Sequence, residues 1–143
     1  MTWIEKEDLQ TPFPSINHMC GTMKREGKRY LVVVGGKLEN GETLSNCSYN
    51  YFPEKGWQSC QNLHEPLEGG QLINDPETGD LLLLGGRNGN NDQNTIYRLS
   101  DIDGEWMLEE QTMMKVGRRG FSAMFLPDGI INCDQSVNEH DEL

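Results

Sequence analysis

The sequence predicts an all-β fold built from a repeat of about 50 residues, on three observations. First, a single alanine, Ala123, stands against 16 glycines, a composition that disfavours helices and favours turns. Second, no stretch of 11 residues has the apolar spacing of an amphipathic helix. Third, the double glycine Gly35-Gly36 recurs 50 residues later as Gly85-Gly86, each time directly after an apolar run.

Further marks recur at nearly the same spacing. A tyrosine and then a tryptophan follow each double glycine, and the two tryptophans are 49 residues apart. The marks shared by the two complete repeats are Gly35, Gly36, Tyr49, Trp57, Gly85, Gly86, Tyr97 and Trp106. Because these marks agree on one period, the chain is interpreted as a tandem repeat.

Each repeat is expected to form four short strands. The first strands are expected at 16–23, 70–74 and 120–126, and each ends in a turn that contains glycine. The second strand is the apolar run before the double glycine, and its consecutive apolar residues predict burial on both faces. The third strand holds the tyrosine, and the fourth begins with the tryptophan.

The repeats are incomplete at both ends of the chain. Trp3 is expected to belong to the last strand of an earlier unit, and the third repeat has only two strands. We expect one domain over residues 1–134, followed by an acidic, flexible tail at 135–143. The expected repeats within this domain are 16–60, 68–109 and 119–133.

An apolar run, a double glycine, a tyrosine and a tryptophan at this period resemble the kelch repeat. The resemblance covers roughly residues 3–133 and implies a β-propeller in which each repeat is one four-stranded blade. It implies a partial kelch-type propeller of about three blades, incomplete at both ends. Since propellers close with typically four to eight blades, this chain alone cannot close a ring, and a homodimer could complete one.

Charge and composition exclude several classes of partner. With 12 Lys and Arg against 23 Asp and Glu, the net charge is −11, so no nucleic-acid partner is expected. No run of about 20 apolar residues predicts a membrane span. The kelch resemblance implies a non-enzymatic protein–protein interaction module that binds through the loops of one propeller rim, without a cofactor. The alternative is a fragment of a larger kelch protein, a ubiquitin-ligase adaptor or a galactose-oxidase-like enzyme, without autonomous activity.

Lys115, Arg118 and Arg119 are the candidate partner-binding residues. They form a cationic cluster directly before Gly120, where the kelch resemblance implies a ligand-binding rim. Because guanidinium groups pair with carboxylates in a bidentate manner, the expected partner is an acidic protein segment. The alternative is that these cations pair with nearby acids of the same chain.

No metal site is expected. His18, His64 and His140 lie far apart without a metal-ligating neighbour. The kelch resemblance implies that His18 and His64, near the start of a blade, serve packing and turn hydrogen bonds. The acid- and amide-rich stretch 88–94 invites comparison with a calcium loop but lacks its spaced ligands and terminal glutamate. A flexible surface loop is expected there instead.

The cysteines and the two ends of the chain bear on the compartment. Cys20, Cys47, Cys60 and Cys133 lack the C-x-x-C spacing and are expected to be reduced packing residues. The first residues do not resemble a signal peptide, so a cytoplasmic location is expected. The last four residues, His140-Asp141-Glu142-Leu143, match an endoplasmic-reticulum retention signal, which would imply the lumen only if a signal peptide exists upstream.

Overall fold

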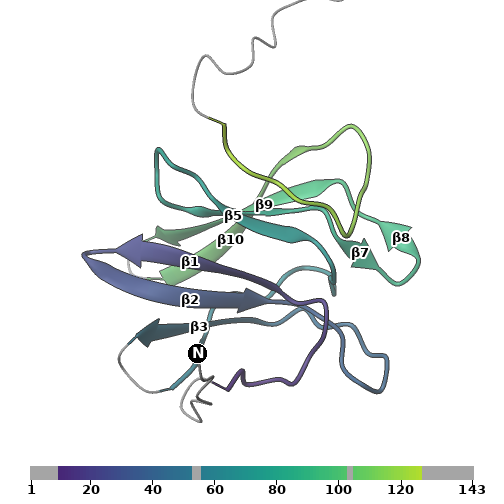
Figure 1. The fold of residues 1–143 in the computed structure, drawn as a ribbon, viewed down its shortest axis with the longest axis horizontal. Coiled ribbons are helices and arrows are strands. Elements are labelled where there is room, and N and C mark those ends of the chain that lie inside the picture. Colours follow the sequence, from purple (N-terminus) through teal and green to yellow (C-terminus); the bar gives the residue numbers. More distant parts are fainter. Residues whose placement is uncertain (1–9, 53–55, 103–104, 127–143) are drawn as a thin grey trace, which may run out of the picture.

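The structure, a computed structural model, describes residues 10–52, 56–102 and 105–126. These residues contain ten strands and no helix, so the all-β prediction is confirmed (Figure 1). Within the same ranges we find no helix that could cross a membrane.

The first sheet is formed by the first repeat. Its four strands are antiparallel and follow one another in sequence order: β1 (Met19–Arg25), β2 (Lys28–Val34), β3 (Cys47–Phe52) and β4 (Gln58–Ser59). The β1–β2 turn consists of Glu26 and Gly27, whose φ angles are 48° and 76°. Two consecutive positive φ angles match the right-handed twist of a tight hairpin, as the glycine turn predicted.

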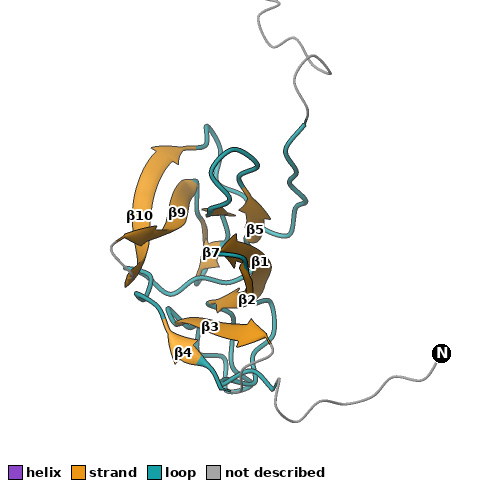
Figure 2. Ribbon diagram, turned by 90° about the vertical axis from the view of Figure 1, so that its left-hand side faces the viewer, coloured by secondary structure: helices purple, strands orange, loops and turns teal. Residues whose placement is uncertain are grey.

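The second sheet is formed by the second repeat. It has the same antiparallel order: β5 (Gln71–Asn74), β6 (Leu81–Leu84), β9 (Thr95–Ile102) and β10 (Glu105–Met113). Between β6 and β9 lies a small hairpin of β7 (Arg87–Asn88) and β8 (Asn91–Asp92), within the stretch expected to be a flexible loop. The two sheets form separate layers, and β1 lies next to β5 (Figure 2).

The core lies between these two layers. The expected burial of the second strands on both faces is wrong, because fully buried residues alternate with half-buried ones along β2 and β6. Only one face of each strand meets the other sheet, and the opposite face is partly covered. The buried core residues of the strands are Met19, Met23, Val32, Val34, Cys47, Leu72, Leu81, Leu83, Tyr97, Leu99 and Leu108.

The third repeat departs from expectation. Residues 119–126 form no strand, and Met124 is 75% exposed. A strand requires a neighbour for its backbone hydrogen bonds, and no segment among the described residues forms a ladder with 120–126. The rest of the third repeat, Trp3 and the tail at 135–143 fall outside the described residues.

The kelch resemblance implies that Trp57 and Trp106 lie buried between adjacent blades, against the double glycines. Trp57 is only half-buried, and the side chain of Trp106 falls outside the description. The atoms nearest to a Cβ built on Gly35 belong to the carbonyl of Leu67 and the side chain of Met19. A backbone carbonyl from the following connection thus makes the close approach that glycine permits.

Cys47 and Cys60 form a disulfide, so the expectation of reduced cysteines is wrong for this pair. Ser48 pairs with Ser59 in the β3–β4 ladder, which places the adjacent cysteines opposite each other with Cα atoms 5.1 Å apart. Their separation of 13 residues in sequence gave no hint of this pairing. Cys20 is free and exposed.

An ion-pair cluster joins the two sheets at the end with the β1–β2 turn. Asp80 pairs with Arg25 of β1 and accepts a hydrogen bond from Arg98 of β9 at 3.0 Å. Arg98 also lies 3.1 Å from Asp75. The hydrogen bond to Asp80 is the main reason that the pKa of Arg98 is raised above its ordinary value. This cluster ties the first repeat to the second.

Candidate partner-binding rim

Two loops of each repeat meet at one end of the sheets, and we call this end the rim. Ile16 and Lys37 exchange two backbone hydrogen bonds, of 2.9 and 2.8 Å. In the second repeat Glu68 and Arg87 exchange an equivalent pair, of 3.0 and 2.8 Å. The backbone therefore places Lys37 and Arg87, each directly after a double glycine, at equivalent positions of the rim.

A hollow lies on the rim where the two repeats meet. A cavity of about 650 Å³ is lined by Asn17, Lys37, Glu68 and Arg87, among others. A second cavity of about 250 Å³ shares Asn17, Glu68 and Arg87 and adds Arg119. Because the two share three lining residues, we treat them as one continuous rim cavity that extends from Lys37 to Arg119. Its size is typical of ligand-binding pockets.

Glu68 lies at the centre of the rim cavity and is only 3% exposed. Its Oε1 accepts two hydrogen bonds from Arg87, at 3.2 and 3.0 Å, and its Oε2 accepts one from Asn17 at 3.0 Å. The ammonium group of Lys37 lies 3.8 Å from Oε1. A buried carboxylate is stable when it is paired in this way, so Glu68 holds Lys37 and Arg87 in place.

The same contacts set the ionisation of Glu68. The hydrogen bond from Asn17 is the largest influence, and it lowers the pKa of Glu68 below the ordinary 4.5. Burial acts in the opposite direction, while Arg87 and Lys37 lower the pKa further. Glu68 is therefore an ionised anchor at neutral pH.

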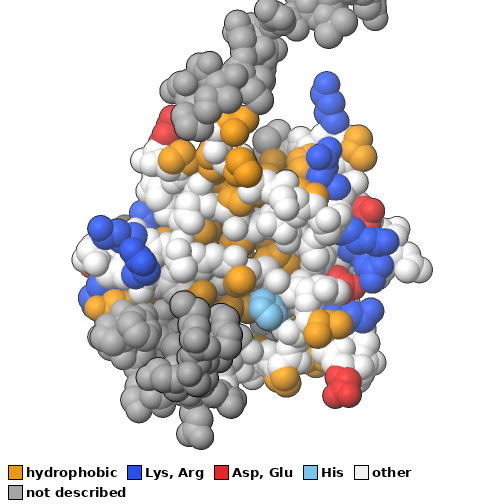
Figure 3. Space-filling model, viewed as in Figure 1, with side chains coloured by type: hydrophobic (Ala, Val, Ile, Leu, Met, Phe, Trp, Pro, Cys, Tyr) orange, Lys and Arg blue, Asp and Glu red, His pale blue; other side chains and the backbone are white. Residues whose placement is uncertain are grey.

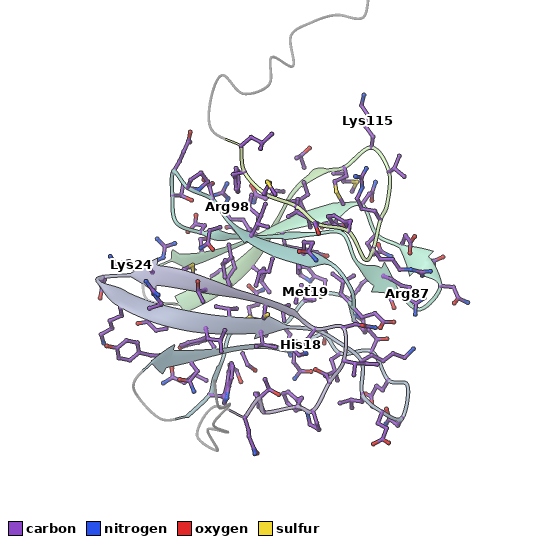
Figure 4. The ribbon with its side chains drawn as sticks, viewed as in Figure 1. His18, Met19, Lys24, Arg87, Arg98 and Lys115 are labelled. Atoms are coloured by element: carbon purple, nitrogen blue, oxygen red, sulfur yellow. A yellow bond between two sulfur atoms is a disulfide. The ribbon has the colours of Figure 1, made fainter. Side chains whose placement is uncertain are left out.

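Of the three predicted partner-binding residues, only Arg119 lines the rim cavity. Its guanidinium lies 3.3 Å from Asp92, and both side chains are largely exposed. Arg118 is exposed and lies over the ring of Phe121, 5.9 Å from its centre. Lys115 is exposed and extends from its loop away from Arg87 (Figure 4). The structure thus separates a cluster that is continuous in sequence.

Sequence reasoning missed Asn17, Lys37, Glu68 and Arg87. A signal was present for two of them, because a cation follows the double glycine in both repeats, as Lys37 and Arg87. No local signal marked Glu68, whose partner Asn17 lies 51 residues earlier in the chain.

The two histidines among the described residues, His18 and His64, do not line the rim cavity. Nδ1 of His18 lies 3.0 Å from the carbonyl oxygen of Ser15, directly before β1, which agrees with the expected role in a turn (Figure 4). His64 is exposed. In the described ranges no group of three His, Cys, Asp or Glu residues is arranged to hold a metal ion.

No family model matches the chain, and no curated protein matches it.

Proposed function

We propose that the chain is a non-enzymatic protein-interaction module of the kelch type, and that its two sheets are consecutive blades of a partial β-propeller. Two features support this proposal. Both sheets contain four antiparallel strands in sequence order, with β4 and β10 at one edge and β1 and β5 at the other. The backbone bonds also repeat, since Gly36 donates to Leu67 and Gly86 donates to Arg118, each at 2.8 Å.

The proposed partner is an acidic protein segment that binds in the rim cavity. The observation that carries this proposal is that three cations line one continuous cavity. The cations Lys37, Arg87 and Arg119 line it against the carboxylates Glu39 and Glu68, in a chain whose net charge is −11. The side chains of Lys37, Arg87 and Arg119 are 32, 26 and 47% exposed, so carboxylates of a partner could form charge-assisted hydrogen bonds with them.

The state of Glu68 supports binding rather than catalysis. A general base needs a free lone pair and a pKa near the working pH. Both oxygens of Glu68 accept hydrogen bonds from the chain itself, and its pKa is lowered. Its role is to hold Arg87 and Lys37 in place for an anionic partner.

The disulfide supports an oxidising compartment rather than the cytoplasmic location expected from the sequence. Disulfides such as Cys47–Cys60 persist in secretory and extracellular environments and are rare in the cytosol. We infer that the module works in such a compartment.

The alternative, a fragment of a larger kelch protein, is favoured by one observation. Met124, Phe125 and Leu126 are 75, 42 and 47% exposed, as expected where further strands would pack. Light scattering after size-exclusion chromatography distinguishes the two. A discrete species supports an autonomous module, whereas a polydisperse aggregate supports the fragment.

Fluorescence anisotropy with a labelled peptide rich in Asp and Glu tests the proposed function. We expect Lys37→Ala and Arg119→Ala each to weaken binding, and the combined change of Arg118 and Arg119 to alanine to cost about 2 kcal/mol if the contact is desolvated. Lys24→Ala is the control, because it removes the same charge from the end of β1 distant from Arg87 (Figure 4). Equal losses of peptide affinity for Lys24→Ala and Arg119→Ala would indicate non-specific charge attraction and contradict the proposal.

A further inference from the structure

The two sheets pack against each other through opposite faces of the repeat, so the two faces left uncovered are also different. Gly21 of β1 pairs with Val32 of β2, so both lie on one face of the first sheet. A Cβ built on Gly21 would lie 3.2 Å from the side chains of Leu72 and Leu81 in the second sheet. This face of the first sheet therefore contacts the second sheet directly.

Equivalent positions of the two repeats do not meet in this contact. With a repeat period of 50 residues, Leu82 is the equivalent of Val32, yet Leu82 is only half-buried. The residues of β6 that face the first sheet are Leu81 and Leu83, which are both 0% exposed. The contact is therefore heterologous, since one face of the repeat packs against the other face of the next repeat.

One uncovered face remains at each end of the two-sheet stack, and the two uncovered faces are of opposite kind. We call the outer face of the second sheet, together with residues 121–126, the second-sheet end. The ring of Phe121 would lie 3.2 Å from a Cβ built on Gly85, which places this segment at the end of β6. The half-buried apolar strand residues of this outer face are Ile73, Leu82, Leu84 and Ile96. Hydrophobic side chains also gather over the upper half of the view in Figure 3, where residues 115–126 run in Figure 1.

The outer face of the first sheet, with the chain before β1, forms the first-sheet end. Leu31 and Val33 lie on this face and are half-buried. Phe13 lines a small hollow together with Val33, and it is 39% exposed. Both ends are thus apolar and partly uncovered. They are the same two faces of the repeat that already pack together between the two sheets of the chain.

We propose that a second copy of this chain covers both ends. The first-sheet end of each copy packs against the second-sheet end of the other, and the pair closes through two equivalent heterologous contacts. Each new contact repeats the one that the two sheets already make within one chain, and for this reason a second copy fits both ends. Such closure covers the apolar faces without growth into a filament. The proposal is independent of what binds in the rim cavity.

Light scattering of the full chain and of single surface variants tests this arrangement. We expect the unchanged chain to be a dimer, and Met124→Glu and Phe13→Glu each to be a monomer at the same concentration. Met124 is 75% exposed, so we expect its replacement to leave the core intact, and circular dichroism is used to check that both variants fold. Met113→Glu is the control, because Met113 is 59% exposed at the end of the outermost strand, β10, and should leave the dimer unchanged.

Mixing the two monomeric variants tests the head-to-tail geometry. Each variant keeps one intact end of opposite kind, so an equimolar mixture should form a mixed dimer with one unchanged contact. A folded monomer of the unchanged chain at its highest soluble concentration overturns the proposal. A Phe13→Glu variant that stays dimeric, or a series of larger oligomers of the unchanged chain, overturns the closed head-to-tail pair in the same way.

Discussion

Gly86 donates its backbone N–H to the carbonyl oxygen of Arg118 at 2.8 Å, which ties the end of β6 to the segment that carries Arg119. Gly36 makes the equivalent bond to Leu67 in the first repeat. The double glycines therefore do more than end a buried strand. They bring the connection to the next repeat onto the rim, where the cations line the cavity.

The first prediction isolates this close approach at Gly85. A Cβ built on Gly85 would lie 2.5 Å from the carbonyl oxygen of Arg118, whereas one built on Gly89 meets nothing within 4 Å. Both glycines have a φ of 57°, so they share the same backbone strain on substitution. We expect Gly89→Ala to lower the free energy of unfolding by about 1 kcal/mol and Gly85→Ala by about 3 kcal/mol or more. Urea unfolding measures both, and equal losses would show that the carbonyl contact is unimportant.

The second prediction concerns the pH dependence that Glu68 confers. Its pKa is lower in the folded protein than the ordinary 4.5, so its contribution is complete above pH 4.5 and is lost as the pH falls through the folded pKa. We expect Glu68→Gln to lower the free energy of unfolding by about 2 kcal/mol at neutral pH and by much less in acid. Glu42→Gln changes an exposed carboxylate and serves as the control. A Glu68→Gln deficit that is constant across this pH range would refute the assignment.

The third prediction concerns the disulfide between Cys47 and Cys60. It closes a loop of 13 residues and holds the short strand β4 against β3. We expect a reducing agent to lower the free energy of unfolding by about 3 kcal/mol, the value typical of a loop of this length. Cys60→Ser should have the same low stability and no response to the reductant. Unchanged stability of the wild-type chain after verified reduction would be inconsistent with this role.

The fourth prediction compares two aspartates. The side chain of Asp80 is 10% exposed and pairs with Arg25 and Arg98, whereas that of Asp92 is 42% exposed and pairs with Arg119. We expect Asp80→Asn to lower the free energy of unfolding by about 2 kcal/mol and Asp92→Asn to lower it by less than about 0.5 kcal/mol, because water screens the exposed pair. Thermal unfolding of both variants checks this order. Similar losses would mean that the Asp80 cluster does not join the sheets.

The sequence predicts those elements whose signal is local. Glycine turns and apolar runs predict the strands of the first two repeats, because chain reversal and side-chain alternation depend on neighbouring residues. The Cys47–Cys60 pairing and the anchoring of Arg87 by Glu68 depend on strand register and on contacts between connections, which no short motif reports. For the same reason the sequence could not show that Arg119 lines the rim cavity while Arg118 and Lys115 do not.

An NMR titration of the full chain with the acidic peptide, monitored through backbone amide shifts, tests whether the rim cavity binds an acidic partner. We expect the largest shifts at residues that line the rim cavity, such as Asn17, Glu68 and Gly69, and at Gly120 beside Arg119. We expect little change at the β1–β2 turn, where Lys24 and Lys28 provide positive charge away from the cavity. Shifts centred on that turn, or no saturable shifts at all, would contradict the claim that the rim cavity binds an acidic partner.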